Sequence, residues 1–157
     1  KTIPPSRAYL KLWEALSILG DWPRKDETVI DLGSAPGSWT WALSELGPKV
    51  ISMDRSELDP KVMRAKNIQF KTGDAFSVTP TQMDWVFSDV ICFPEKLFEY
   101  MEGWIESGFC EKFVANVKFA GEVDPAIIHK FRQLPHSRVM HLLNGKKEIT
   151  WIRHPKL

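Results

Sequence analysis

Hydrophobic residues occur in two alternating patterns along the chain. In one pattern they recur every three or four residues, which predicts amphipathic helices over residues 7–19, 37–46, 60–65, 94–107 and 125–134. In the other pattern they form short runs bounded by turn residues, which predicts strands over 28–32, 49–53, 67–71, 84–88 and 113–117. Helices and strands therefore alternate through most of the sequence.

Capping residues delimit several of these helices. Ser6 is a suitable N-cap for the first helix, and Gly20 follows its end. Pro94 opens the longest helix, and Asp124-Pro125 combines a cap with a proline at the first helical position. These residues support the helix assignments independently of the apolar spacing.

The last part of the chain carries a different signal. Two apolar runs, 139–143 and 149–152, flank Asn144-Gly145, a dipeptide typical of hairpin turns. Together with the alternation before it, this predicts an α/β fold: a mostly parallel sheet with helices on both faces and a C-terminal antiparallel hairpin. A chain of 157 residues is expected to form one domain over residues 1–157.

Composition excludes several classes of protein. The chain is 43% hydrophobic and 26% charged, which argues against a disordered tail or a coiled coil. It has no apolar run long enough for a membrane helix and no secretory leader pattern, so no membrane contact is expected. Only two cysteines are present and no finger-like metal-ligand spacing occurs, which favours a reducing cytoplasm and no metal site.

Charge is unevenly distributed although the net charge is only +1. Residues 1–25 carry a net +3, residues 26–128 carry −8, and residues 129–157 carry +6. If the two basic ends meet in the fold, they form a positive face suited to phosphate. Ordinary solvated surface is the alternative interpretation.

Ligands of open α/β sheets bind where the strands end at their carboxyl side. The residues at these ends are Gly33, Asp54, Asp74, Asp89 and Lys118. The first strand continues into a glycine loop, Gly33-Ser34-Ala35-Pro36-Gly37-Ser38-Trp39. Its spacing matches neither the dinucleotide motif nor the phosphate-gripping P-loop.

Two of these carboxylates are suited to an adenosine group. Asp54 is placed to bind ribose hydroxyls, and Asp74 could accept a hydrogen bond from an adenine amine. Together with the glycine loop they predict a site for adenosine that lacks a phosphate-binding loop. Such a site suits S-adenosylmethionine better than a nucleotide. Each aspartate alone could equally be a turn residue, and the loop a plain strand–helix turn.

Several segments resemble one enzyme family. They are Ser6-Arg7-Ala8-Tyr9-Leu10-Lys11-Leu12, the loop Asp31–Trp39, Asp84–Asp89, Trp104–Cys110, Asn116-Val117-Lys118 and Glu148-Ile149-Thr150. In order and spacing they resemble the FtsJ-like ribose 2′-O-methyltransferases, most closely the catalytic domain of the RlmM type, which methylates a cytidine ribose of large-subunit ribosomal RNA. The resemblance implies a Rossmann-like methyltransferase fold, S-adenosylmethionine as cofactor, bound by the glycine loop and by Asp54, Asp74 and Asp89, and RNA as substrate.

The family's Lys-Asp-Lys-Glu tetrad falls on Lys11, Asp89, Lys118 and Glu148. Their convergence is also expected from topology. Asp89 and Lys118 end parallel strands, and Glu148 begins a strand that reaches the same sheet edge if it runs antiparallel. Lys118 is the candidate for deprotonating the 2′-hydroxyl, with orientation of the hydroxyl and oxyanion stabilisation as the other possibility.

Contacts to RNA phosphates are expected from Arg7, Lys146, Lys147 and Arg153, although plain surface charge explains them equally well. RlmM-type enzymes carry an additional N-terminal RNA-binding region, for which the chain has no counterpart. Three explanations are open: the chain is an excised catalytic domain that works with an RNA-targeting domain or a protein partner, or it relies on its own basic ends, or its RNA differs.

Three other functions remain open. The same tetrad serves enzymes that methylate a messenger-RNA cap or transfer RNA. A binding module for S-adenosylmethionine and RNA without turnover is a second alternative, against which the complete tetrad argues. A nicotinamide-dependent oxidoreductase is a third, and the glycine spacing argues against it.

Overall fold

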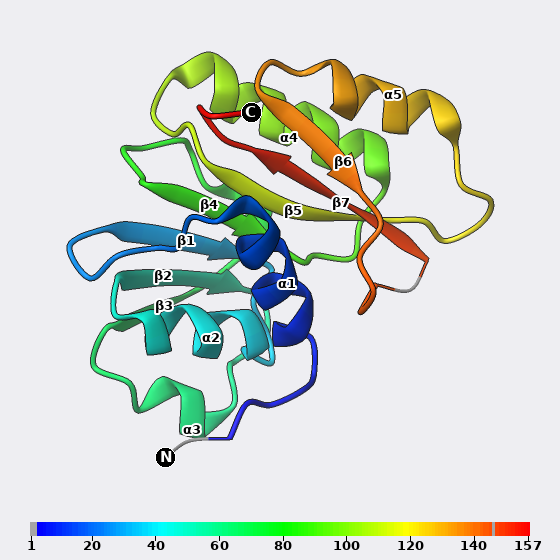
Figure 1. Cartoon of the computed structure of the whole chain (residues 1–157). Helices are drawn as coiled ribbons and strands as arrows, with labels where there is room; N and C mark the ends of the chain where they lie inside the picture. Colours follow the sequence, from blue (N-terminus) through cyan, green and yellow to red (C-terminus); the bar gives the residue numbers. More distant parts are fainter. Residues whose placement is uncertain (1–2, 146) are drawn as a thin grey trace.

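The computed structural model describes residues 3–145 and 147–157 and contains a seven-stranded sheet (Figure 1). Its strands are β1 (Thr28–Leu32), β2 (Lys49–Asp54), β3 (Ile68–Thr72), β4 (Trp85–Ser88), β5 (Phe113–Lys118), β6 (Ser137–Met140) and β7 (Glu148–Arg153). Its helices are α1 (Tyr9–Leu19), α2 (Ser38–Leu46), α3 (Pro60–Met63), α4 (Pro94–Ser107) and α5 (Pro125–Gln133), with a short 3₁₀ turn at Ala75–Ser77.

The strand order in the sheet is β3-β2-β1-β4-β5-β7-β6. The first five strands are parallel, whereas β7 runs antiparallel to both β5 and β6. The predicted mostly parallel sheet with a C-terminal antiparallel hairpin is confirmed. The chain moves outward from β1 to β3 and then returns to the other side of β1, so the order reverses between β1 and β4, where a ligand groove opens in such sheets.

Helices cover both faces of the sheet, as predicted (Figure 1). On one face α1 and α2 bury Leu16 and Leu43 against Trp85 and Phe87. On the other, α4 and α5 pack against the strands in a second buried cluster, which includes Trp104. Burial on both faces explains why β4 is apolar at nearly every position. In the described part of the chain, no helix has both the length and the apolar character needed to cross a membrane.

The first helix starts later than its spacing predicted. It begins at Tyr9, with Ala8 at the N-cap position and no capping side chain. Ser6, the expected cap, instead accepts a hydrogen bond from the Ala8 amide in the preceding turn. The helix predicted over 60–65 is also shorter and ends at Met63.

The connection in the C-terminal hairpin is longer than the two-residue turn that Asn144-Gly145 suggests. β6 ends at Met140, and seven positions separate it from β7. Leu142 is buried in the core, and the Glu14 carboxylate of α1 accepts hydrogen bonds from the amides of Leu143 and Asn144. Tertiary contacts with α1 therefore end β6 early and fold the connection against that helix.

A charged cluster fixes the opposite end of α1 to the C-terminal segment. Asp21 Oδ2 accepts hydrogen bonds from His154 Nε2 at 2.8 Å and from Lys112 Nζ at 2.9 Å. Partial burial alone would raise the pKa of Asp21, but these two donors outweigh it and lower the pKa from 3.8 to about 2. The ionised carboxylate thus stabilises the folded chain.

We expect Asp21→Asn to lower the free energy of unfolding by about 1–3 kcal/mol at neutral pH, because two charge-assisted hydrogen bonds are lost. Since the pKa of Asp21 is depressed in the folded state, its contribution is complete above its ordinary value of 3.8 and is lost as the pH falls toward about 2. Urea unfolding at pH 7 and pH 3 measures both effects. Asp26→Asn, at an exposed position, is the matched control, and equal stability of the two variants would contradict the assignment.

Candidate functional site

The glycine loop after β1 lies directly against the loop after β4. Gly33 has φ +73° and Gly37 has φ +117°, both in the left-handed region that L side chains seldom adopt. A Cβ atom on Gly33 would lie 2.6 Å from the Cβ of Val90. Only glycine allows this approach, which brings the ends of β1 and β4 together at the switch point of the sheet.

A cavity of about 280 Å³ lies beside this contact. The glycine loop forms much of its wall, and Asp54, Asp89 and Lys118 contribute from three other strand ends. The loop residues that line it are Gly33, Ser34, Ala35, Pro36, Ser38 and Trp39. Gly37 of the same loop is the N-cap of α2, and a Cβ atom on it would lie 3.3 Å from Val62 Cγ1.

A second cavity, of about 260 Å³, adjoins the first. Gly33 and Asp54 line both cavities, and Asp74 and Phe76 line the second one. The two cavities therefore follow the carboxyl ends of β1, β2 and β3 as one groove, with Asp54 between them.

Asp54 and Asp74 already hold the walls of this groove. Asp54 Oδ2 accepts a hydrogen bond from the Ala35 amide at 2.8 Å and so fixes the glycine loop. Asp74 accepts hydrogen bonds from the Phe76 amide at 2.9 Å and from Arg55 Nη2 at 2.8 Å, which together lower its pKa. Each carboxylate keeps its predicted place in the groove and also has a structural role that the sequence did not indicate.

Asp31 is a lining residue that the sequence analysis missed. It is 1% exposed, and its Oδ2 accepts a hydrogen bond from Thr40 Oγ1 at 2.7 Å. Its Oδ1 has no hydrogen-bond partner within the described residues, although Asp31 lines the first cavity. Burial, helped by the charges of Asp89 and Asp54, raises its pKa to about 7. The available signal was an acidic residue inside an otherwise apolar strand.

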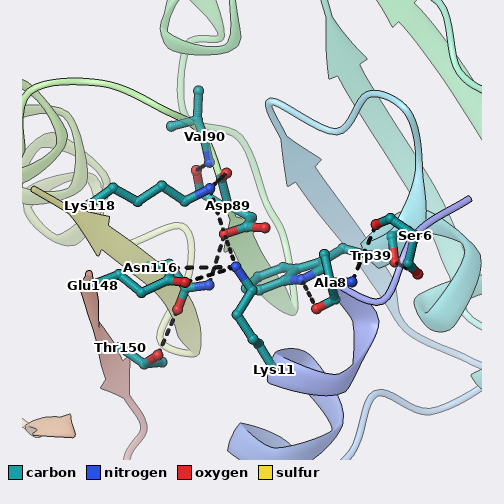
Figure 2. A network of polar contacts seen from close by, with 12 residues as sticks. Ser6, Ala8, Lys11, Trp39, Asp89, Val90, Asn116, Lys118, Glu148 and Thr150 are labelled. Atoms are coloured by element: carbon teal, nitrogen blue, oxygen red, sulfur yellow. Dashed lines mark hydrogen bonds and ion pairs between the residues drawn. The ribbon is translucent and has the colours of Figure 1, made fainter. Parts of the chain in front are cut away.

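Ser38 and Trp39 link the glycine loop to the start of α1. Ser38 Oγ accepts a hydrogen bond from the Tyr9 amide and donates one to the Ser6 carbonyl, both at 2.9 Å. Trp39 Nε1 donates to the Ala8 carbonyl at 2.9 Å (Figure 2). The position of α1 is thus set by the same loop that lines the first cavity.

The four tetrad residues lie together at the carboxyl edge of the sheet (Figure 2). Lys11 Nζ of α1 lies 3.1 Å from Asp89 Oδ1 and 3.1 Å from Glu148 Oε1. Lys118 Nζ lies 3.0 Å from the same Asp89 oxygen and donates to the Asp89 carbonyl at 2.7 Å. Two ammonium groups and two carboxylates therefore form one connected network.

The antiparallel hairpin explains how Glu148 reaches this network. Lys118 ends β5 and Glu148 begins β7, and the two are direct partners in the ladder. The side chain of Glu148 is 8% exposed and that of Lys118 is 23% exposed. Ordinary surface ion pairs are far more exposed, so this network is a partly buried site rather than a solvated charge cluster.

A third cavity, of about 540 Å³, lies on the other side of the tetrad. Lys118 and Ala8 line both this cavity and the first one, so Lys118 stands between them. Arg7 and Lys147 also line the third cavity, and both are exposed. We refer to it below as the acceptor cleft.

The other predicted RNA contacts are placed differently. Arg153 pairs with Phe113 at the start of β5 and donates to the carbonyl oxygens of Pro135 and Glu111, so it lies at the opposite end of the strands from the cleft. Lys146 lies outside the described residues. Arg153 is close to Glu148 in the sequence but not in space, because the two residues are the opposite ends of the extended strand β7.

Comparison with known proteins indicates the family. The profile of the FtsJ-like methyltransferases matches residues 4–144. A ribosomal RNA large subunit methyltransferase M from Thauera aminoaromatica is 28% identical over 163 residues, covering 93% of this chain and 45% of that protein. Its counterpart from Halorhodospira halophila is 36% identical over 118 residues, covering 73% and 35%. The chain thus spans less than half the length of these curated relatives.

A solved structure agrees in fold. A Plasmodium falciparum protein assigned as a ribosomal RNA methyltransferase superposes with a TM-score of 0.66 at 17% sequence identity. The superposition covers 95% of this chain and 96% of that one. The predicted Rossmann-like methyltransferase fold is therefore confirmed.

The contact between Gly33 and Val90 can be tested with a matched pair of variants. Gly33→Ala should lower the free energy of unfolding by about 2–4 kcal/mol, because the new Cβ atom meets Val90 and the backbone stays left-handed. Gly103→Ala, in α4, where the new Cβ atom would meet no other part of the described chain within 4 Å, should stabilise the chain by about 0.5–1 kcal/mol. Thermal unfolding of both variants measures this, and a Gly33→Ala variant as stable as Gly103→Ala would contradict the packing argument.

Proposed function

The chain belongs to the FtsJ-like methyltransferase family, and we propose that it transfers a methyl group from S-adenosylmethionine to a ribose 2′-hydroxyl of RNA. The observation that carries this proposal is the place of Lys118 between the groove at the glycine loop and the acceptor cleft. The names of the curated relatives favour large-subunit ribosomal RNA as the substrate.

The residues of the groove suit S-adenosylmethionine. Asp31, whose Oδ1 has no hydrogen-bond partner within the described residues, and Asp89 both line the first cavity, and two carboxyl groups there favour a cationic ligand such as an ammonium or sulfonium group. The second presents Asp74, which would receive the adenine amine, and Asp54 lies between the two, where a ribose would bind. No lysine stands in the glycine loop to bind a phosphate, in keeping with a cofactor that has none. When bound, this cofactor supplies an activated methyl group.

The chain's own residues would prepare the acceptor. An ammonium group has three N–H donors; in Lys118 one donates to the Asp89 carbonyl, and a second would point to Asp89 Oδ1, the ion-pair partner 3.0 Å from Nζ. The third is left for the 2′-oxygen of a nucleotide in the acceptor cleft, which orients that oxygen toward the groove. A neutral Lys118 would keep both contacts with Asp89 and use its lone pair as the base.

In the complete reaction the 2′-oxygen forms a bond to the methyl carbon while the carbon–sulfur bond breaks. In the base mechanism the hydroxyl proton passes to the lone pair of a neutral Lys118 Nζ, and where Lys118 is an ammonium group that only orients the oxygen, the proton leaves to water. Lys11, held by Asp89 and Glu148, adds positive charge near the developing oxyanion. The residues thus supply alignment, a proton acceptor and charge stabilisation.

We expect Lys118→Ala to lower methyl transfer by about 10²–10⁴-fold, because the group that contacts the acceptor is lost. Binding of S-adenosylmethionine, measured by calorimetry, should remain nearly unchanged. The assay follows transfer of a labelled methyl group to total RNA, and nuclease mapping then locates the label. Lys130→Ala on the exposed face of α5 is the control and should keep wild-type turnover.

The outcomes of this assay separate the candidate functions. Label on a ribose 2′-oxygen that disappears in Lys118→Ala supports the proposal, and its position identifies the RNA, including a cap or transfer RNA. Turnover by Lys118→Ala equal to that of the wild type would overturn the role of Lys118. Cofactor binding without any transfer would favour a binding module. It would equally fit an enzyme that requires an RNA-targeting region, which the additional length of the relatives could supply.

Arg7 and Lys147 should bind RNA phosphates at the acceptor cleft. We expect Arg7→Ala and Lys147→Ala each to raise the KM for RNA several-fold and to reduce the salt dependence of binding by about one charge. Filter binding at several salt concentrations measures this. Arg138→Ala removes one exposed positive charge from β6, away from the cleft, and an equal loss of affinity in that variant would mean that only overall charge matters.

A further inference from the structure

Two polar side chains lie buried beneath the tetrad. Asn116 on β5 is 0% exposed and Thr150 on β7 is 2% exposed, and they are direct partners in the antiparallel ladder. Lys118 and Glu148 form the pair two positions nearer the carboxyl end of β5. Because side chains alternate along a strand, both pairs project from the same face of the sheet.

On this face of β5 and β7 the buried polar pair adjoins an apolar one. The pair two positions deeper on the same face is Val114 and Ile152, both buried and apolar. An amide and a hydroxyl cost free energy when they leave water, unless their hydrogen bonds are satisfied. The packing of the sheet alone does not call for Asn116 and Thr150, so their hydrogen bonds are the feature to explain.

These hydrogen bonds run in one direction, from β7 to the tetrad. Thr150 Oγ1 donates to Asn116 Oδ1 at 2.6 Å, and Asn116 Nδ2 donates to Asp89 Oδ1 at 2.8 Å (Figure 2). An ionised carboxylate only accepts hydrogen bonds, so the amide must present its nitrogen to Asp89. The Thr150 hydroxyl then fixes the amide from its other end.

As a result, Asp89 Oδ1 has three donors around it. They are Lys11 Nζ at 3.1 Å, Lys118 Nζ at 3.0 Å and Asn116 Nδ2 at 2.8 Å. The two ammonium groups belong to long, flexible side chains, whereas Asn116 is fully buried in a strand. The amide is therefore the rigid member that fixes the rotation of the carboxylate, and through it the position of Lys118.

We infer that Asn116, oriented by Thr150, is a positioning residue for the methyl transfer proposed above, on which this inference rests. It acts through Asp89 and does not touch the acceptor. Without the amide, the carboxylate can rotate and bind the two lysines through both oxygens. Lys118 Nζ then moves relative to the acceptor cleft, and small displacements of a reacting group are costly to turnover.

The sharpest test uses variants at Thr150. Thr150→Val keeps the shape of the side chain and removes the hydroxyl, and we expect kcat to fall about tenfold with unchanged KM for RNA and unchanged affinity for S-adenosylmethionine. Thr150→Ser restores the hydroxyl and should return kcat to near the wild-type value. Asn116→Leu removes the amide itself and should lower kcat about a hundredfold.

Ile152→Val is the matched control for stability. It alters one methyl group on the same strand and the same face, outside the hydrogen-bond chain. All variants are assayed well below their melting temperatures. Equal kcat values for Thr150→Val and Ile152→Val, or no recovery in Thr150→Ser, would overturn the positioning role.

A second readout does not depend on activity. NMR spectra of protein labelled with ¹⁵N-lysine report the ammonium groups of Lys11 and Lys118, which should shift in Thr150→Val and not in Ile152→Val. Unchanged ammonium signals in Thr150→Val would refute the inference even if the proposed reaction is correct. Shifted signals in a chain that transfers no methyl group would support the arrangement around Asp89 while the proposed function fails.

Discussion

The structure of the site depends on the charge balance around the Asp89 carboxylate. Two lysines that are largely withdrawn from water need anionic partners, because an unpaired ammonium group at such a position is costly. Asp89 Oδ1 serves both, and Glu148 shares Lys11. Since these side chains come from a helix, two strands and the loop after β4, the pairing fixes α1 and the start of β7 relative to the central strands.

The position of α1 links the groove to the acceptor cleft. Ser38 and Trp39 of the glycine loop hold its first residues by hydrogen bonds, and Glu14 further along holds the connection before β7. The N-terminal end of the helix is therefore tied to the loop that lines the first cavity, and Leu10 and Lys11 of the helix line the acceptor cleft. A shift of the glycine loop would be transmitted to Lys11 through a single rigid element.

The fold separates the acidic and basic segments of the sequence onto two sides of Lys118. The acidic middle of the chain supplies Asp31, Asp54, Asp74 and Asp89 to the groove at the ends of β1 to β4. The basic ends supply Arg7 and Lys147 to the acceptor cleft on the other side of Lys118. Such a division suits a cationic methyl donor on one side and a polyanionic acceptor on the other.

The local pattern of the sequence determined the elements and much of the site. Strand ends pointed to Asp54, Asp74, Asp89 and Lys118, since parallel strands place their carboxyl ends at one edge. Gly33 was recognisable from the loop spacing, but the reason that glycine is needed there is the contact with Val90, which lies far away in the sequence.

Only the tertiary structure decided the features that depend on contacts between distant segments. The early end of β6 follows from Leu142 entering the core and from the Glu14 carboxylate. Asp31 and Asn116 looked like ordinary strand residues until burial and hydrogen-bond direction showed what each of them faces. Periodicity and turn residues act over a few positions and are visible in the sequence, whereas burial and the pairing of charges depend on which elements meet in space.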